Sequence, residues 1–212
     1  MASVVDISNL ALAHLGDAAT VSSISPSDGS AQADHCVRFY PIARDVLLEA
    51  HDWNFARRRV LLTETANTPP ASWAYEYALP ANVVRVLKVL GEDENENTPK
   101  VYLQGTDANG AKVIWCNEPS ARVLYTHAVT DTTKFSGLFV NALSYLLASY
   151  LAGPITKDMK QKEGMYKLFR NELGLAGVTD KSANNNPPDT TPDWISARGY
   201  TNPFLLDGRI TR

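Results

Sequence analysis

The chain has 212 residues, and 44% of them are hydrophobic, which is enough for one fair-sized core or two small ones. Its formal net charge of -3 provides no global basic field that would attract nucleic acid. The two cysteines, Cys36 and Cys116, lie far apart in the sequence without CxxC spacing, which argues against a disulfide scaffold and a zinc site. The N-terminus has no basic leader and carries Asp6, so we expect no secretion signal.

The N-terminal part shows a helical pattern. Ser3, followed three residues later by Asp6, resembles a capping signal, and apolar residues then recur at helical spacing. After a polar loop, the pattern predicts a longer helix over about residues 30–51. Pro41 lies inside it and should kink or split the helix, because proline has no backbone N–H.

Residues 56–130 lose the helical period and are rich in β-branched residues and turn signals. Four segments are predicted strands: 82–90, 100–105, 112–117 and 121–129. Short turns separate the last three, which predicts an antiparallel meander. The acidic loop GEDENEN, residues 91–97, is expected to be a solvated loop tip.

Helices are predicted again after the β region. Residues 135–152 carry no charge and reach the lower length limit of a membrane span, but they include polar side chains and stop at Gly153-Pro154. We therefore expect a buried helix and no membrane insertion. A last helix, capped by Thr156, should run to about Gly174.

The sequence thus predicts an α+β fold, mainly α: a bundle of about four helices with an inserted antiparallel β region and an extended C-terminal arm. The expected boundaries are 1–55 and 131–177 for the bundle, 56–130 for the β insertion and 178–212 for the arm. The arm retains Trp194, Tyr200 and Phe204, whereas disordered linkers are poor in aromatic residues. We expect it to dock onto a partner.

A structural joint is predicted where the second helix meets the β insertion. Its residues are Tyr40, His51, Trp53, Asn54 and Phe55. The two aromatic side chains after the histidine are expected to be buried, and Asp52 or Asn54 to satisfy loose backbone groups. Downstream, Arg57 and Arg59 should share one strand face with Arg58 opposite, so the three arginines cannot grip one phosphate together.

Small residues form a stripe along the apolar helix: Gly137, Asn141, Ser144, Ala148 and Ala152. Such a stripe lets another helix backbone approach closely. The neighbour is either the second helix of the same chain or another subunit.

Three segments together, ALAHLGD, CVRFYPIARDVLLEAHDWNFA and YALPANVVRVLKV, resemble the head-to-tail adaptor family of short-tailed phages, the tail tubular protein A family. The resemblance covers about residues 4–176. Its most specific residues are Tyr40, Arg44-Asp45, Leu47-Leu48, His51, Trp53, Asn54, Phe55 and Ala56. The family pattern usually has proline between the histidine and the tryptophan, where this chain has Asp52.

The resemblance implies a non-enzymatic virion protein without cofactors, at the portal vertex of the tail and made in the host cytoplasm. Family members form a dodecameric ring under the portal, receive the tail nozzle (tail tubular protein B type) and surround the channel through which DNA passes without specific binding. It also implies that an aromatic arm docks onto the portal protein.

Two other functions stay open. Some adaptors of related phages are reported as peptidoglycan hydrolases, and Glu49 and Asp52 could share a helix side, but no catalytic signature accompanies them. His35 and Cys36 point about 100° apart on a helix and make a poor nucleophile pair, and His127 alternates with strand residues.

The other alternative is a DNA-binding protein. Basic residues crowd the last helix: Lys157, Lys160, Lys162, Lys167 and Arg170. Acidic residues are interspersed among them, as on an ordinary solvated helix face.

Overall fold

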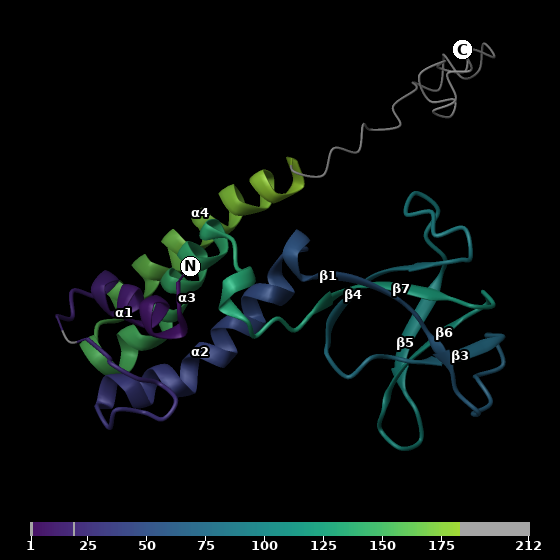
Figure 1. The fold of residues 1–212 in the computed structure, drawn as a ribbon, viewed down its shortest axis with the longest axis horizontal. Helices are drawn as coiled ribbons and strands as arrows, with labels where there is room; N and C mark the ends of the chain where they lie inside the picture. The colour runs from purple at the N-terminus through teal and green to yellow at the C-terminus, as the bar shows by residue number, and fades with distance from the viewer. Residues whose placement is uncertain (1, 19, 183–212) are drawn as a thin grey trace, which may run out of the picture. The chain divides into compact units, whose positions relative to one another are not determined.

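The computed structural model describes residues 2–18 and 20–182, and within them it has four α-helices and seven strands (Figure 1). The helices are α1 (Val4–His14), α2 (Ala31–Ala50), α3 (Gly137–Thr156) and α4 (Met159–Ser182). The strands are β1 (Arg57–Leu61), β2 (Thr63–Glu64), β3 (Tyr75–Ala78), β4 (Val83–Leu90), β5 (Tyr102–Thr106), β6 (Lys112–Cys116) and β7 (Arg122–His127). Two 3-10 turns, Asn54–Ala56 and Thr132–Lys134, flank the β region. The predicted α+β, mainly α fold is confirmed.

Side-chain caps start the first three helices. The Ser3 hydroxyl accepts a hydrogen bond from the backbone N–H of Asp6, and the Asp6 carboxylate accepts one from the backbone N–H of Ser3, so the predicted capping signal is a complete capping box. Ser30 caps α2 and Ser136 caps α3 in the same way. Each hydroxyl accepts a hydrogen bond from the backbone N–H three residues later in the chain.

Pro41 does not split α2, which is continuous from Ala31 to Ala50. Pro41 is exposed, and so is Val37, whose carbonyl loses its helical donor there. Water can therefore satisfy that carbonyl, and the helix passes through the proline.

Two helix ends differ from the prediction. α3 continues through Gly153-Pro154 and stops at Lys157, whose backbone is left-handed (φ 54°) and whose N–H bonds the oxygen of Ala152, 3.1 Å away. The proline lies in the last turn, so the kink it would cause affects only the final residues of the helix. Asp158, and not Thr156, then caps α4, by accepting from the backbone N–H of Lys160 at 2.8 Å.

The other difference is at the end of α4, which runs to Ser182 and not to Gly174, so residues 178–182 belong to a helix and not to the arm. A helical glycine costs about 1 kcal/mol. The added turns carry Asp180, whose contacts with Asn54 are described below. Residues 183–212, which include Trp194, Tyr200 and Phe204, lie outside the described part of the chain.

Two hydrophobic cores form. One joins the four helices with Trp53, Ala56, Val129 and Phe135. α3 is its central helix and the one helix of the described residues that is long and apolar enough to cross a membrane, with a mean hydropathy of 1.5 and 56% of its most apolar window buried. The other core lies between two antiparallel sheets, whose strand orders are β1-β7-β4 and β2-β3-β6-β5.

The predicted meander is wrong in its last step. β5 pairs with β6, but β7 pairs with β1 and β4 in the other sheet. The free edge of β6 is taken by β3, and the turn after β6 contains Ser120 in a left-handed conformation (φ 53°). At this turn the backbone oxygen of Ala121 accepts a hydrogen bond from the N–H of Leu62. The segment between β1 and β2 and the segment between β6 and β7 therefore pass from one sheet to the other side by side.

Candidate functional site

The predicted joint is held by aromatic packing. Trp53 is 1% exposed, and its indole Nε1 donates to the backbone oxygen of Leu47 at 2.8 Å. Its ring meets that of Phe139 edge-on, with centroids 5.0 Å apart. Phe55 is half-buried rather than fully buried, and its ring packs against Phe135 and Phe139. The joint is therefore part of the core of the bundle.

The end of α4 is tied to the same joint. Asn54 donates its backbone N–H to the Asp180 carboxylate at 2.9 Å and its Nδ2 to the Asp180 backbone oxygen at 2.6 Å. His51 packs edge-on against Trp53, and its Nε2 lies 3.8 Å from the Asp180 carboxylate. A Cβ at Gly177 would lie 3.2 Å from the His51 ring, so the glycine allows the helix to pass close.

Tyr40 faces the same core at 5% exposure, and burial raises the pKa of Tyr40 to about 12. Its phenol is neutral at physiological pH, as suits a packing residue.

The proposed carboxylate pair is not assembled. Glu49 is exposed and lines a groove of about 420 Å³ with residues of β4 and β5, but Asp52 does not line it. The Asp52 carboxylate lies 3.6 Å from the Arg57 guanidinium instead. The sequence spacing places the two residues on either side of the end of α2, where the chain changes direction.

Glu76 is a buried carboxylate that the sequence analysis did not single out. It accepts hydrogen bonds from Trp115 Nε1 (2.7 Å), Thr65 Oγ1 (2.7 Å) and Asn67 Nδ2 (2.8 Å). These bonds, the one from Trp115 most of all, lower the pKa of Glu76. A glycosidase acid needs a raised pKa, so Glu76 does not have the character of one.

The remaining candidates for chemistry are packed or isolated. Cys36 is fully buried, and burial raises the pKa of its thiol, which disfavours the nucleophilic thiolate. Burial lowers the pKa of His127, with a further contribution from the nearby Arg58. His35 is half-buried beside Phe39. Within residues 2–18 and 20–182, no three His, Cys, Asp or Glu side chains are grouped to hold a metal.

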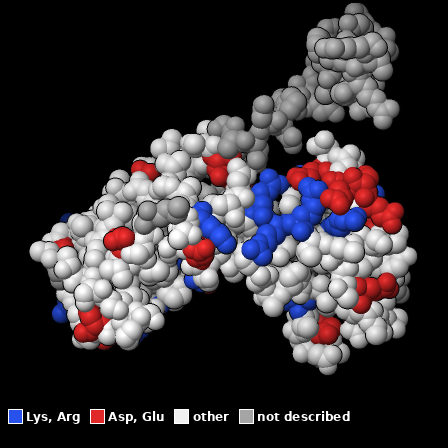
Figure 2. All heavy atoms as spheres, viewed as in Figure 1, with Lys and Arg blue, Asp and Glu red and all other residues white. Residues whose placement is uncertain are grey.

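Cationic residues of three strands gather on one face of the β1-β7-β4 sheet. The pairing register places Arg57, Arg59, Arg85, Lys88 and Arg122 on the same side, because directly opposed residues share a face. Arg58 lies on the opposite side, as predicted. We call these five residues the basic face. Figure 2 shows Lys and Arg concentrated where these strands lie, directly beside a group of acidic residues.

The acidic loop was predicted to be a solvated tip, and this prediction is wrong in part, because the loop contacts the basic face. Glu94 pairs with Arg59 (2.8 Å) and with Arg122 (3.0 Å). Glu96 pairs with Arg57 (3.1 Å) and also with Arg59. The Lys88 ammonium donates to the backbone oxygen of Glu96 at 2.8 Å. The spacing of the acidic residues gave no sign of these contacts, because their partners come from separate strands.

The charges of this network reinforce one another. Hydrogen bonding to Arg59 is the main cause that lowers the pKa of Glu94, and the bond to Glu94 in turn raises the pKa of Arg59. Glu94 has a left-handed backbone (φ 51°), which is unfavourable for a residue other than glycine. Glu94 is therefore held as a carboxylate against the guanidinium groups of Arg59 and Arg122.

The basic residues that were predicted to crowd the last helix are not gathered in this way; one of them, Lys157, ends α3 and the others lie on α4. Lys157, Lys160, Lys162, Lys167 and Arg170 are all exposed, and none forms an ion pair with another described residue. Their exposure is that of a solvated helix face, which the acidic residues interspersed among them also indicate.

The small-residue stripe of α3 faces the bundle over most of its length. Ser144, Ala148 and Ala152 are buried, and the Ser144 hydroxyl lies 3.1 Å from Nε2 of His14 on α1. Asn141 is half-buried. Gly137 is exposed, and a Cβ there would meet nothing within 4 Å. The stripe was predicted to include Gly137, but the close packing does not extend to it. At Ser144 the neighbour is the first helix, not the second.

A scan against protein-family models finds no match, and a search of curated proteins finds no match either.

Proposed function

We propose that the chain is a structural adaptor of a short-tailed phage virion, which forms a ring that joins the portal to the tail nozzle and surrounds the DNA channel. The observation that carries the proposal concerns the most specific residues of the family resemblance. Trp53, Asn54 and Phe55 hold the segment that leads from α2 to the β region against the bundle, through ring packing and through hydrogen bonds to Leu47 and Asp180. Their distinctive pattern thus has a structural use and needs no chemistry to explain it.

The arrangement of cores supports the same role. The bundle and the sheet pair each have their own hydrophobic core, so each offers a surface whose side chains can change without unfolding the other. An adaptor needs two such surfaces, one for each partner. We assign residues 183–212, with Trp194, Tyr200 and Phe204, to portal docking, because buried aromatic anchors supply much of the binding energy at interfaces.

The hydrolase alternative has less support. Its two carboxylates, Glu49 and Asp52, do not share a groove, and the pKa of the buried Glu76 is shifted in the wrong direction for a general acid. Neither observation offers a positioned acid and base.

Electron microscopy of the purified full chain, alone and mixed with portal rings of the same virion, tests the proposal. We expect an additional ring stacked on the portal, and none on portal rings incubated with buffer. The proposal fails if the chain remains a monomer with portal present and reduces the turbidity of purified cell wall, with that activity abolished by Glu49→Gln in a folded protein.

A further inference from the structure

The basic face carries more positive charge than the described residues place against it. Its five cations meet three carboxylates, those of Asp52, Glu94 and Glu96. Among the described residues, the hydrogen-bond partner of Arg85 is a backbone oxygen, that of Glu49. A chain with a net charge of -3 thus concentrates positive charge on one face of one sheet. Local charge of this kind attracts anions even when the whole protein is acidic.

The acidic loop is attached to this face almost entirely by side-chain ends. The described backbone hydrogen bonds within the loop are local turns, from Glu94 N to Gly91 O and from Thr98 N to Asn95 O. The ion-pairing side chains keep between 23% and 41% of their surface exposed, so each pair is screened by solvent and individually weak. A stronger anion can compete with the two glutamates without disturbing either core.

We propose that the basic face binds the phosphate backbone of nucleic acid, and that the carboxylates of Glu94 and Glu96 occupy the phosphate positions until a nucleic acid displaces them. The inference goes beyond the adaptor role and does not depend on it. Each glutamate is already held by two guanidinium groups, which is the way arginines hold a phosphate.

The chemistry of the face favours nucleic acid over an acidic protein. Four of its five cations are arginines, whose planar forks match phosphate oxygens. Neighbouring strands lie about 4.8 Å apart, and alternate residues of a strand lie about 6.8 Å apart, so the charges form a two-dimensional array suited to successive phosphates. A protein interface needs a desolvated apolar centre. On this face Leu90 and Leu124 are already buried, and Leu61 is the exposed leucine at its edge.

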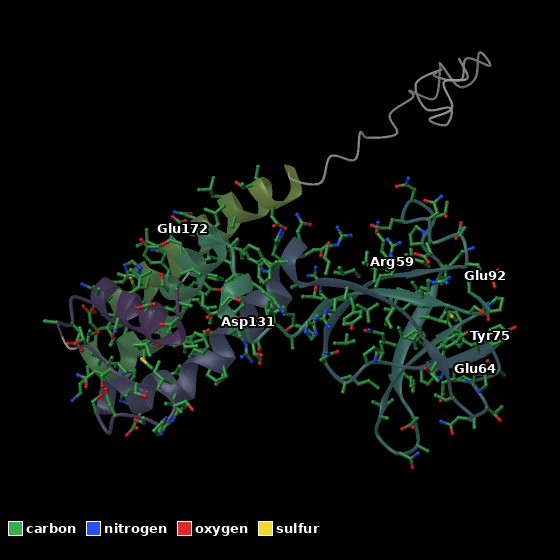
Figure 3. The ribbon with its side chains drawn as sticks, in the orientation of Figure 1. Arg59, Glu64, Tyr75, Glu92, Asp131 and Glu172 are labelled. Atoms are coloured by element: carbon green, nitrogen blue, oxygen red, sulfur yellow. The ribbon has the colours of Figure 1, made fainter. Side chains whose placement is uncertain are left out.

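The test compares two double variants of the full chain that remove the same charge from the same loop. Glu94→Gln with Glu96→Gln releases the arginines. Glu92→Gln with Asp93→Asn is the matched control, because these exposed carboxylates form no ion pair with described residues, and Glu92 lies apart from Arg59 in Figure 3. Binding of a fluorescein-labelled random-sequence DNA duplex is measured by anisotropy across a range of salt concentrations, and melting temperatures verify folding.

We expect the wild type and the control to bind weakly and alike. The Glu94/Glu96 variant should bind about tenfold more tightly at low salt, with a salt slope steeper by about 1 to 2, because each additional phosphate contact adds about 0.9 to that slope. Adding Arg59→Gln and Arg122→Gln to this variant should abolish the gain.

Equal binding by the two double variants would overturn the inference, and so would a gain that survives loss of the arginines. Tighter binding of polyglutamate than of DNA by the Glu94/Glu96 variant would show that the face takes an acidic protein segment and would also overturn it. The portal-ring micrographs judge the adaptor role separately, so failure of one proposal can be told from failure of the other.

Discussion

Replacing Trp53 with alanine tests whether the joint is part of the bundle core. The indole is 1% exposed and contacts the rings of His51, Phe55 and Phe139. A buried tryptophan removes on the order of 200 Å² from water, which at about 25 cal/mol per Å² corresponds to about 5 kcal/mol. Large-to-small aromatic replacements in cores cost about 3–5 kcal/mol, in agreement with this value. Since domains are stable by only about 5–15 kcal/mol, the loss is a large part of the total.

Urea unfolding followed by circular dichroism gives the measurement. With a slope of about 2–3 kcal/mol per M, the midpoint should fall by about 1–2 M. Trp53→Phe is the matched control, because it keeps a ring but loses the 2.8 Å bond to Leu47, and it should cost about 1–2 kcal/mol. An unchanged midpoint for Trp53→Ala, together with loss of a measurable enzymatic activity, would refute the assignment of this residue to packing.

Three further predictions concern separate parts of the chain. Ala148→Leu inserts bulk at a fully buried position and should lower monomer stability by about 1–3 kcal/mol, whereas Gly137→Ala, in open space, should not; a thermal melt of each variant decides. Because Arg59 lowers the pKa of Glu94 below its usual 4.5, the stability contributed by this pair is present above pH 4.5 and lost as pH falls through the lowered value; Glu94→Gln should remove this part of the acid sensitivity in hydrogen exchange of the acidic loop. Deleting residues 190–212 should leave the melting temperature unchanged and weaken co-sedimentation with portal rings, and unchanged co-sedimentation would exclude the arm as the docking element.

The helices and the strands of the β region that the sequence predicted follow from local signals. Helical periodicity placed α1 and α2, and alternation with turn residues placed β4 to β7. Helix interruptions were predicted at Pro41 and at Pro154 because the effect of each proline was judged without its surroundings. Pro41 is exposed and Pro154 lies in the last turn of α3, and both helices continue through their proline.

Long-range pairing could not be predicted in the same way. β7 joins β1 and β4 while β3 takes the edge of β6, and the short β3, with its buried Glu76, is not among the four strands that the sequence predicted. The basic face has the same origin. Arg57 and Arg59 are visible as a run in the sequence, but Arg122 joins them only through strand register.

The two hydrogen bonds between Asn54 and Asp180 have a mechanical consequence. They hold the last turn of α4 to the segment that links the bundle to β1. A pulling force applied to the chain beyond Ser182 would therefore be borne first by Asn54, ahead of the apolar contacts of α4. The load would enter the molecule at the segment between its two cores, so that tension on the C-terminal segment would act on the same residue that precedes the β region.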